Sequence, residues 1–334
     1  MNKKVLITGG AGYIGSHAVR EFLLKGYEVI VFDNLSRGHK NAIESLKKYG
    51  NLTFVEGDLT KLEDVKNLFS LIKEVDGVLH FAALCSVNES TEDPKLYFYN
   101  NVYGTMNILN EMVENNVNNL VFSSTCAVYG ESQYLPIDEK HPTKPTNPYG
   151  ESKCMVEKML VNYSKAYGLN NVILRYFNVC GAADDGNIGD AKNPSVHLMQ
   201  NAVRGALNIE PFKLTYPEVD TKDLSPIRDY IDVQDLIDAH FKAFEYLTKG
   251  GKSNTFNLGT GKGNSVLEIV EKVEEKLKVD LPRETGQKRE GEYAAVYADF
   301  KKAKEILNWE PKRNLEDSVN SLVTWYENHP KGYE

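Results

Sequence analysis

The segment Lys4–Ser16, KVLITGGAGYIGS, decides the fold. Its apolar run KVLIT leads directly into Gly9, Gly12 and Gly15, and the residues after them have helical spacing. Glycines here let the backbone turn tightly and approach a pyrophosphate, while the N-terminus of the following helix supplies unpaired N–H groups. A second apolar run ends in Asp33, where a carboxylate accepts hydrogen bonds from the adenosine ribose. The pattern predicts a dinucleotide-binding loop; the alternative is a structural turn without a ligand.

The residues around Asp33 indicate which dinucleotide binds. A carboxylate there repels the 2′-phosphate of NADP and accepts hydrogen bonds from the free hydroxyl of NAD. Arg37 follows four residues later and weakens this preference, because a guanidinium accommodates a 2′-phosphate. The sequence predicts NAD as the cofactor.

Further along the chain, short apolar runs alternate with helical patterns. The runs lie at 4–8, 28–32, 52–56, 77–82, 119–124 and 171–178, and the helical patterns near 13–25, 61–73, 94–116 and 149–167. Strands that are apolar throughout and alternate with helices form parallel sheets covered on both faces, so we expect a doubly wound α/β (Rossmann) domain over 1–178. Gly, Asp and Asn follow Asn178, and helices are expected near 195–208, 232–248, 264–278 and 315–328. Residues 179–334 are predicted to form a smaller α/β substrate lobe, partly intertwined with the first domain.

Composition excludes several classes of protein. The 334 residues are 41% hydrophobic and carry a net charge of −8, so the chain buries a large core and does not present a nucleic-acid surface. The four cysteines are dispersed without a CxxC pair or a zinc-like histidine spacing, and we expect free thiols and no metal site. The sequence contains neither a signal peptide nor a membrane-length apolar run. We therefore expect a cytoplasmic protein with no membrane partner.

The stretch Thr146–Lys153, TNPYGESK, places Tyr149 and Lys153 four residues apart at the start of a helical pattern. Asn147 and Pro148 suit the first positions of a helix, so the tyrosine and the lysine share one face. A phenol titrates near pH ~10, and a neighbouring cation favours the phenolate, which makes the pair a candidate general base. Taken alone, YxxxK is common, and the alternative is a surface lysine beside a capping tyrosine.

The motifs taken together resemble those of a known family. The GxxGxxG spacing with YxxxK is similar to the extended short-chain dehydrogenase/reductase superfamily. Within it, the ordered motifs resemble the UDP-glucose 4-epimerase (UDP-galactose 4-epimerase) family from residue 3 to the end of the chain: TGGAGYIGSH, FDNLS, HFAAL, ESTEDP, NNVYGT, FSST, NPYGESK, RDYIDV and REGE. The resemblance implies an NAD-dependent isomerase of galactose metabolism that oxidises C4 of a UDP-sugar to a 4-keto intermediate, which rotates and is reduced again. It also implies a homodimer.

The resemblance assigns catalytic roles to three side chains. Tyr149 takes the proton of the sugar 4-hydroxyl, Lys153 lowers the tyrosine pKa, and Thr125 stands where the family usually has serine. Threonine keeps the hydroxyl that donates to the sugar oxygen. We expect the neighbouring Ser124 to be satisfied by backbone at the strand end, and Cys126 to fill space.

The resemblance also implies a set of cofactor contacts. Cys85 stands where most epimerases have lysine, which removes one ionic contact. The expected NAD contacts are Gly9, Gly12, Tyr13, Ile14, Gly15, Asp33, Asn34, Leu35, Ser36, Arg37, Asp58, Leu59, Phe81, Ala82, Ala83, Cys85, Asn100, Tyr149, Lys153 and Phe177.

For the nucleotide sugar, the resemblance implies a second set. An arginine is suited to a diphosphate because its planar fork donates two parallel hydrogen bonds. The expected contacts are Thr125, Tyr149, Asn178, His197, Leu198, Arg228, Arg289, Glu292 and Val296. Val196-His197-Leu198 replaces the family's usual Asn-Asn-Leu, which weakens the uracil contact.

Val296 aligns with a family position that lies against the C2 substituent of the sugar, where a tyrosine restricts the pocket. A valine there opens volume for an N-acetyl group, so UDP-N-acetylglucosamine and UDP-N-acetylgalactosamine (UDP-GlcNAc and UDP-GalNAc) are further candidate substrates. The alternative is that Val296 is an ordinary strand residue, and Tyr297 next to it would restore the bulk after a one-residue slip.

Two other functions compete with the epimerase. A nucleotide-sugar 4,6-dehydratase needs an Asp-Glu pair after the threonine, where this chain has Cys126-Ala127. A non-catalytic NAD-sensing regulator keeps the fold as a binding module but tends to lose the Tyr/Lys pair. The expected dimer would use helices near 94–116 and 149–167, where the following residues fit either an interface or a core: Leu96, Tyr97, Val102, Met106 and Ile108.

Overall fold

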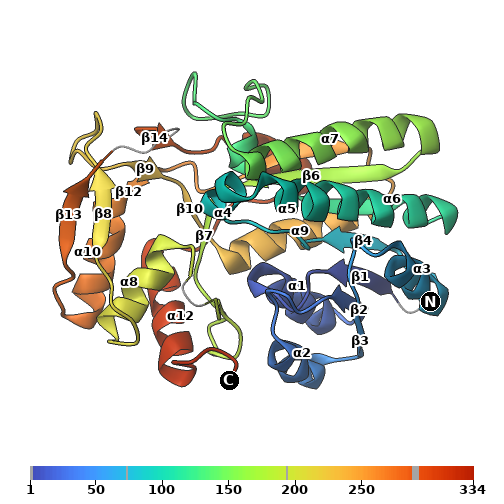
Figure 1. Cartoon of the computed structure of the whole chain (residues 1–334), viewed down its shortest axis with the longest axis horizontal. Helices are drawn as coiled ribbons and strands as arrows, with labels where there is room; N and C mark the ends of the chain where they lie inside the picture. Colours follow the sequence, from blue (N-terminus) through green and yellow to red (C-terminus); the bar gives the residue numbers. More distant parts are fainter. Residues whose placement is uncertain (1–2, 73, 193–194, 288–292) are drawn as a thin grey trace. The chain divides into compact units, whose positions relative to one another are not determined.

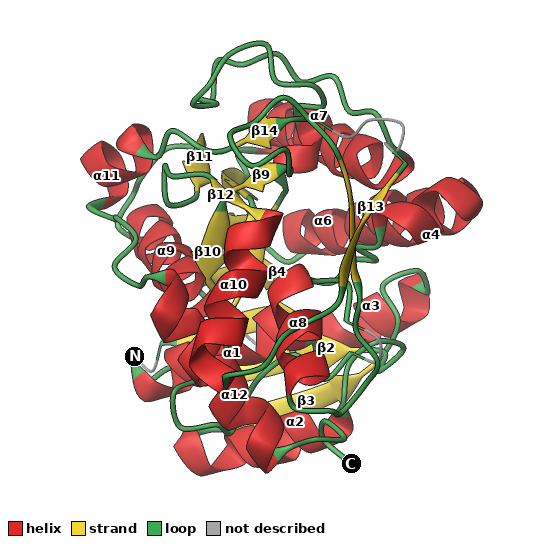
Figure 2. Cartoon of the chain, turned by 90° about the vertical axis from the view of Figure 1, so that its left-hand side faces the viewer, coloured by secondary structure: helices red, strands yellow, loops and turns green. Residues whose placement is uncertain are grey.

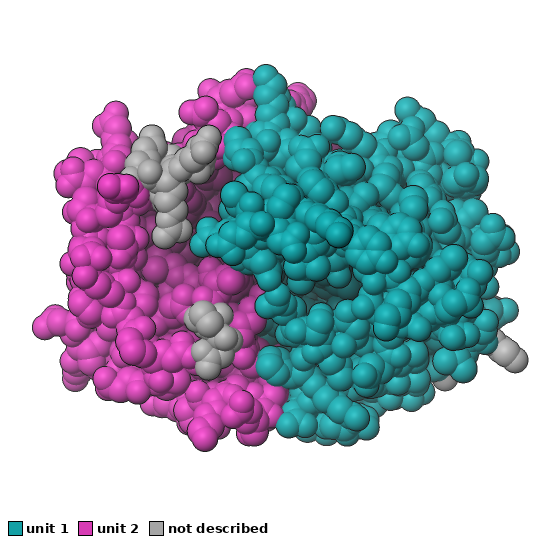
Figure 3. Space-filling view, viewed as in Figure 1, with its two compact units in different colours: residues 1–130, 142–175, 237–256 teal, residues 131–141, 176–236, 257–334 magenta. Residues whose placement is uncertain are grey.

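The structure is a computed structural model that describes residues 3–72, 74–192, 195–287 and 293–334 (Figure 1). Two compact units share the chain. Unit 1 comprises residues 1–130, 142–175 and 237–256, and unit 2 comprises residues 131–141, 176–236 and 257–334 (Figure 3). Each unit therefore contains segments that are distant in the sequence.

A seven-stranded sheet carries the order β11-β6-β5-β4-β1-β2-β3. The pairs from β3 through β6 are parallel, and the chain order reverses between β1 and β4, which places the carboxyl ends of both strands at a switch point where ligands bind in such sheets. The predicted doubly wound fold is confirmed. The sheet strands are β1 (Lys4–Thr8), β2 (Glu28–Asp33), β3 (Leu52–Glu56), β4 (Gly77–His80), β5 (Asn119–Ser123), β6 (Asn170–Tyr176) and β11 (Asn254–Leu258).

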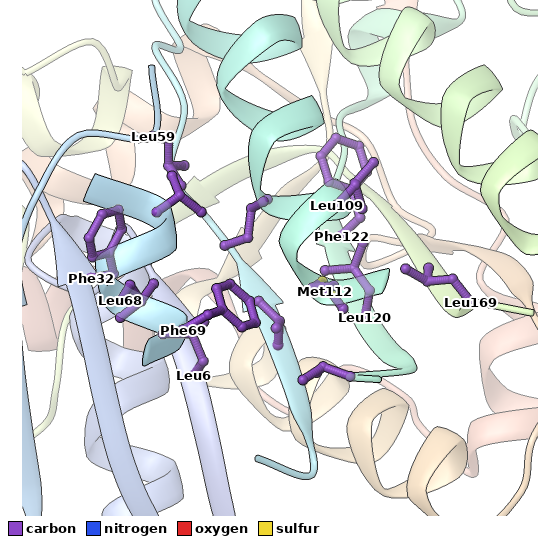
Figure 4. Packing of buried hydrophobic residues seen from close by; sticks show 14 of the residues in the cluster. Leu6, Phe32, Leu59, Leu68, Phe69, Leu109, Met112, Leu120, Phe122 and Leu169 are labelled. Carbon is purple, nitrogen blue, oxygen red and sulfur yellow. The ribbon is translucent and has the colours of Figure 1, made fainter. Parts of the chain in front are cut away.

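Helices cover both faces of this sheet. One face packs on the amphipathic helices α3, α6 and α7, and its core includes Leu6, Phe32, Leu68, Met112 and Phe122 (Figure 4). On the other face, aromatic rings of α1 and α9 meet edge to face. The helices of this region are α1 (Tyr13–Leu24), α2 (Lys40–Leu46), η1 (Lys47–Tyr49), α3 (Leu62–Leu71), α4 (Val87–Glu92), α6 (Gly104–Glu114), α7 (Pro148–Tyr167) and α9 (Val233–Thr248).

The helix predicted near 94–116 is present as three consecutive segments. They are α5 (Pro94–Tyr97), the π-helix η2 (Phe98–Tyr103) and α6. A π-turn inside a helix is rare and occurs frequently at functional sites. Periodicity alone did not reveal this change of helix type.

In unit 2, helices α8, α10 and α12 pack together around a second core that contains Trp325 and Tyr326 (Figure 2). Helix α10 begins with a capping box in which Ser265 and Glu268 satisfy each other's backbone N–H groups. The remaining elements are β7 (Asn178–Cys180), α8 (Leu198–Ala206), β8 (Leu214–Pro217), β9 (Ile227–Arg228), β10 (Tyr230–Asp232), β12 (Asn264–Ser265), α10 (Val266–Leu277), β13 (Arg283–Gly286), β14 (Ala295–Val296), α11 (Lys301–Leu307), α12 (Leu315–Asn328) and, in unit 1, η3 (Cys126–Val128).

Candidate active site

The N-terminal turn of α7 presents Tyr149 and Lys153 on one face. Asn147 caps the helix by accepting a hydrogen bond from the Gly150 N–H at 2.9 Å, and Pro148 occupies the first helical position. Tyr149 and Lys153 then lie one turn apart. The predicted helix start is confirmed, and both side chains are buried, which rules out the alternative of a surface lysine.

Lys153 is held against the end of β5. Its Nζ donates to the Ser123 carbonyl at 2.8 Å and lies 4.9 Å from the centre of the Phe122 ring. Burial lowers the Lys153 pKa to about 8, against the opposing effects of Cys85 and Glu157. The ammonium therefore stays protonated at pH 7 and can stabilise a nearby phenolate.

The turn η3 brings Thr125 close to the start of α7. Thr125 Oγ1 caps this turn by accepting from the Ala127 N–H at 3.1 Å, and the Ala127 carbonyl approaches Gly150 so closely that a Cβ there would lie 2.6 Å away. Ala127 also packs on the cluster that contains Tyr149, Tyr97 and Leu84. The candidate catalytic hydroxyls of Thr125 and Tyr149 therefore belong to one packed neighbourhood of unit 1.

A buried polar network lies beneath this neighbourhood. Ser124 Oγ donates to Glu157 Oε1 at 2.5 Å, so the expectation that backbone satisfies this hydroxyl is wrong. Glu157 receives two further hydrogen bonds from Arg175, at 3.0 and 2.5 Å, and Arg175 Nη1 donates to the Tyr129 hydroxyl at 3.0 Å. Sequence reasoning missed the network, although Glu157 follows Lys153 by one helical turn and so shares its face.

The glycine loop leaves no room for a side chain at Gly9 or Gly15, and its backbone is open at Gly12. Gly9 has φ +72°, and a Cβ there would lie 2.5 Å from the Ala82 nitrogen. At Gly15 a Cβ would lie 2.1 Å from the Gly9 carbonyl oxygen, whereas at Gly12, the N-cap of α1, it would meet only that oxygen at 3.4 Å. This open backbone at a helix N-terminus fits a pyrophosphate.

The end of β2 carries the expected ribose-binding carboxylate. Asp33 accepts hydrogen bonds from the Ala11 N–H at 3.0 Å and the Leu35 N–H at 2.8 Å. Burial raises the Asp33 pKa, and these two hydrogen bonds oppose the rise. Asn34 accepts from the N–H and the hydroxyl of Ser36 and donates to Asp58 at 3.1 Å, so these three expected cofactor residues are joined by hydrogen bonds.

Arg37 forms an ion pair with Glu89, with Nη2 and Oε1 2.5 Å apart. A second expected group lies after β4, where the Phe81 ring is 4.8 Å from the His240 ring. The remaining members occupy a range of environments: Tyr13 and Leu59 are buried, Ile14, Ala82 and Ala83 are half-buried, and Cys85 is exposed.

Asn101, which sequence reasoning missed, is more deeply engaged than the expected contact Asn100. It exchanges hydrogen bonds with the backbone of Leu84, at 2.9 and 3.0 Å, and donates to Ser152 Oγ at 3.0 Å. Asn100 donates to Asn101 at 2.9 Å. The π-helix η2 thus ties the loop after β4 to α7.

In unit 2, the expected substrate residues gather around three short strands. Arg228 in β9 is aligned with Val296 in the parallel strand β14, and its Nη1 donates to the carbonyls of Ile227 and Tyr293. Asn178 in β7 donates from its amide to the Asp229 carbonyl at 3.4 Å. Val296 is buried, and the ring of Tyr297 lies 3.2 Å from where a Cβ on Gly263 would be.

The other expected residues of this region are less informative. His197 is the N-cap of α8, Leu198 is its first residue, and both are half-buried. Phe177 is buried. Arg289 and Glu292 lie outside the described residues.

Comparison with known proteins identifies the family. Residues 5–259 match the model of the NAD dependent epimerase/dehydratase family. The chain belongs to this family. Its epimerase/dehydratase relatives include a UDP-glucose 4-epimerase of Lactobacillus helveticus, 43% identical over 99% of both chains.

Solved epimerase/dehydratase structures agree over the full chain. A UDP-glucose 4-epimerase from Bifidobacterium longum, in complex with NAD+ and UDP, superposes with a TM-score of 0.93 at 34% identity, covering 99% of this chain and 100% of that one. A UDP-Glc/GlcNAc 4-epimerase from Campylobacter jejuni gives 0.85 at 39% identity, over 98% and 100%. The resemblance in the sequence is confirmed.

Among the residues that the structure describes, no group of three or more His, Cys, Asp or Glu side chains is arranged to hold a metal ion. No helix in the described ranges is long and apolar enough to cross a bilayer.

Proposed function

We propose that the protein is an NAD-dependent isomerase that interconverts UDP-glucose and UDP-galactose by epimerisation at C4. The observation that carries this proposal is the buried Tyr149–Lys153 pair beside the Thr125 turn. The relatives and solved neighbours named above, which are UDP-glucose 4-epimerases, support the same reaction.

Three side chains move or hold protons in this proposal. Tyr149 accepts the proton of the sugar 4-hydroxyl and returns it when the other epimer forms. Lys153 stabilises the phenolate because its ammonium is buried, where charge interactions are strong. Thr125 donates its hydroxyl hydrogen to the sugar O4, while its oxygen accepts from the Ala127 N–H.

The residues of unit 1 suit NAD as the cofactor. NAD, when bound, supplies reversible hydride transfer at C4. The glycine loop would receive its pyrophosphate and Asp33 its adenosine ribose hydroxyls, while Lys153 and the loop after β4 would contact the nicotinamide end. NAD is favoured over NADP because the Asp33 carboxylate would repel a 2′-phosphate, and Arg37, which could accommodate that phosphate, is paired with Glu89.

Unit 2 would bind the nucleotide sugar. Arg228 is the candidate diphosphate ligand, and Asn178, His197, Leu198 and Val296 are candidates along the sugar and the uridine. For Arg289 and Glu292, contact with the uridine diphosphate is proposed from the sequence alone. We further propose a cofactor domain at 1–178 and a nucleotide-sugar lobe at 179–334 that is partly intertwined with it, since residues 131–141 and 176–178 belong to unit 2 and residues 237–256 to unit 1.

The competing functions lack support in the same residues. The dehydratase reaction needs acidic residues after the threonine, where this chain has Cys126 and Ala127. An NAD-sensing module does not require a buried Tyr149–Lys153 pair.

Purified protein incubated with UDP-galactose should accumulate UDP-glucose without added NAD. A 4-keto-6-deoxy product would identify a dehydratase, and no turnover after NAD is supplied would refute the isomerase.

Acetylated UDP-sugars are a second candidate substrate class. Val296 is small and buried, and Tyr297 directs its ring toward Gly263. The Tyr297 ring lies beside Gly263, and we infer that it does not fill the volume that a larger residue at position 296 would occupy. We propose that UDP-GlcNAc and UDP-GalNAc are epimerised too, which assays with UDP-GalNAc would test directly.

A homodimer is the proposed assembly. Apolar side chains stand exposed on α5, η2, α6 and α7, which pack together in unit 1: Leu96, Tyr99, Met106 and Met155. Three other apolar residues of this region were expected in either an interface or the core. Tyr97 and Ile108 are core residues, and Val102 is half-buried. Light scattering should give twice the chain mass, and Met106→Glu should reduce it to one chain; a parental monomer would refute the dimer.

A further inference from the structure

The buried pair Glu157–Arg175 is not part of the proton path proposed above, yet it contacts the catalytic segment on both sides of Thr125. Glu157 accepts from Ser124, the residue immediately before Thr125. Arg175 donates to Tyr129, four residues after Thr125, and lies over its ring with a centroid distance of 4.9 Å. The pair thus holds the two ends of the segment 124–129.

The charges of this pair are well compensated where they lie. Both side chains are buried, and Arg175 binds the carboxylate through Nε and Nη2 in a two-bond fork. Ser124 is fully buried and Tyr129 is 1% exposed, so water does not compete for either contact. Buried networks whose members are all satisfied make a segment rigid and specify one arrangement of it.

A third hydrogen bond, from Lys153 to Ser123, also joins α7 to the end of β5. Glu157 follows Lys153 by one turn, and Lys153 binds the Ser123 carbonyl while Glu157 binds the Ser124 hydroxyl. Tyr149, Lys153 and Glu157 thus occupy positions i, i+4 and i+8 of one helix face. A helix that carries Tyr149 is therefore bonded through two consecutive residues to the strand end that carries Thr125.

We propose that Glu157 and Arg175 are positioning residues that fix Thr125 relative to Tyr149 through Ser124 and Tyr129. The inference rests on the proposed epimerase function. In this role neither Glu157 nor Arg175 contacts the substrate. Misplacing a catalytic group by about 1 Å can lower a rate by up to about 10²-fold, so loosening either end should appear in turnover.

Two single-oxygen deletions test this without breaking the ion pair. Ser124→Ala removes the first attachment and Tyr129→Phe the second, and both leave Glu157 bonded to Arg175. Each variant should lower kcat for UDP-galactose roughly 10-fold while KM changes by less than about 2-fold. The double variant should lose more than either single one.

Ser90→Ala is the matched control, because Ser90 is also fully buried and its hydroxyl donates to the Val87 carbonyl of its own helix. Ser90→Ala should retain the parental kcat. The melting temperatures of Ser90→Ala and Ser124→Ala should differ from that of the parent by similar amounts. Unchanged kcat in both test variants, or a loss equal to that of Ser90→Ala, would overturn the inference while leaving the epimerase intact. A parent without epimerase activity would refute the proposed function and the inference with it.

Discussion

The residues around Tyr149 in unit 1 and those on the paired strands β9 and β14 in unit 2 are held in place by different means. In unit 1, Lys153 and Ser124 are buried, and each is bonded between α7 and the end of β5. In unit 2, Arg228 is half-buried and its Nη1 donates to two main-chain carbonyls. A proton-transfer site needs its side chains placed in advance, whereas a binding arginine can exchange carbonyl partners for a phosphate. We therefore expect variants of unit 1 to change kcat and variants of unit 2 to change KM or substrate choice.

The largest expected effect is that of Tyr149→Phe, which removes the base and keeps the ring packed on Tyr97 and Leu84. We expect kcat to fall by ~10²–10⁴-fold with little change in NAD retention or melting temperature. Tyr163→Phe is the control, since Tyr163 lies on the same helix and its hydroxyl donates to Asn110 at the surface. Near-parental turnover of Tyr149→Phe would show that Tyr149 is not the base and that the expected difference between the two units does not hold.

Thr125 should depend on its hydroxyl alone. Thr125→Ser keeps the oxygen that caps η3 and should stay within ~3-fold of the parent, while Thr125→Ala should lose about 10²-fold in kcat. Steady-state assays with UDP-galactose decide between them. Equal rates in the two variants would mean that Thr125 packs the turn and takes no part in proton transfer.

In unit 2, Val296→Tyr should change substrate choice. The ring would occupy the space that we assign to an N-acetyl group, so kcat/KM for UDP-GalNAc should fall by roughly 10²-fold, while that for UDP-galactose is maintained. The retained UDP-galactose activity serves as the internal control for folding. A parent already inert toward UDP-GalNAc would end the proposal of acetylated substrates.

Arg228→Gln should weaken substrate binding while turnover at saturation is retained. Loss of a charged hydrogen-bond donor to a diphosphate should raise KM for UDP-galactose ~10–100-fold and leave kcat within about 3-fold. Arg283→Gln provides the control, because Arg283 belongs to the same unit and pairs with Glu274 at the surface. A kcat loss with unchanged KM would contradict the division between the units.

The smallest expected effect is a pH dependence that originates in unit 1. Burial lowers the Lys153 pKa to about 8, so the ammonium is present below that pH and is lost as the pH rises through it. Without the cation the Tyr149 phenolate is less stable, so kcat should decline above about pH 8; the loss should stay below about 10-fold at pH 10, because a phenol itself ionises near pH ~10. A pH series of kcat for the parent measures this; a flat profile from pH 7 to 10 would show that Lys153 does not control the base.

The local features of this site could be read directly from the sequence. Glycine spacing after a strand, Asp33 at the end of the next one and the Asn147-Pro148 start of α7 each depend on residues close along the chain. Backbone preferences and helix periodicity act over such short ranges, which is why they predict the parallel fold and the shared face of Tyr149 and Lys153.

Only the tertiary structure decided which partners the buried polar groups take. Ser124 could have bonded to nearby backbone, but the fold places Glu157 within reach 33 positions along the chain and Arg175 beside it. The helix expected near 94–116 likewise contains a π-segment that turns Asn101 toward Leu84 and Ser152. A buried charge or amide must find its partner wherever packing brings one, and contacts between residues distant in sequence leave no periodic signal in the chain.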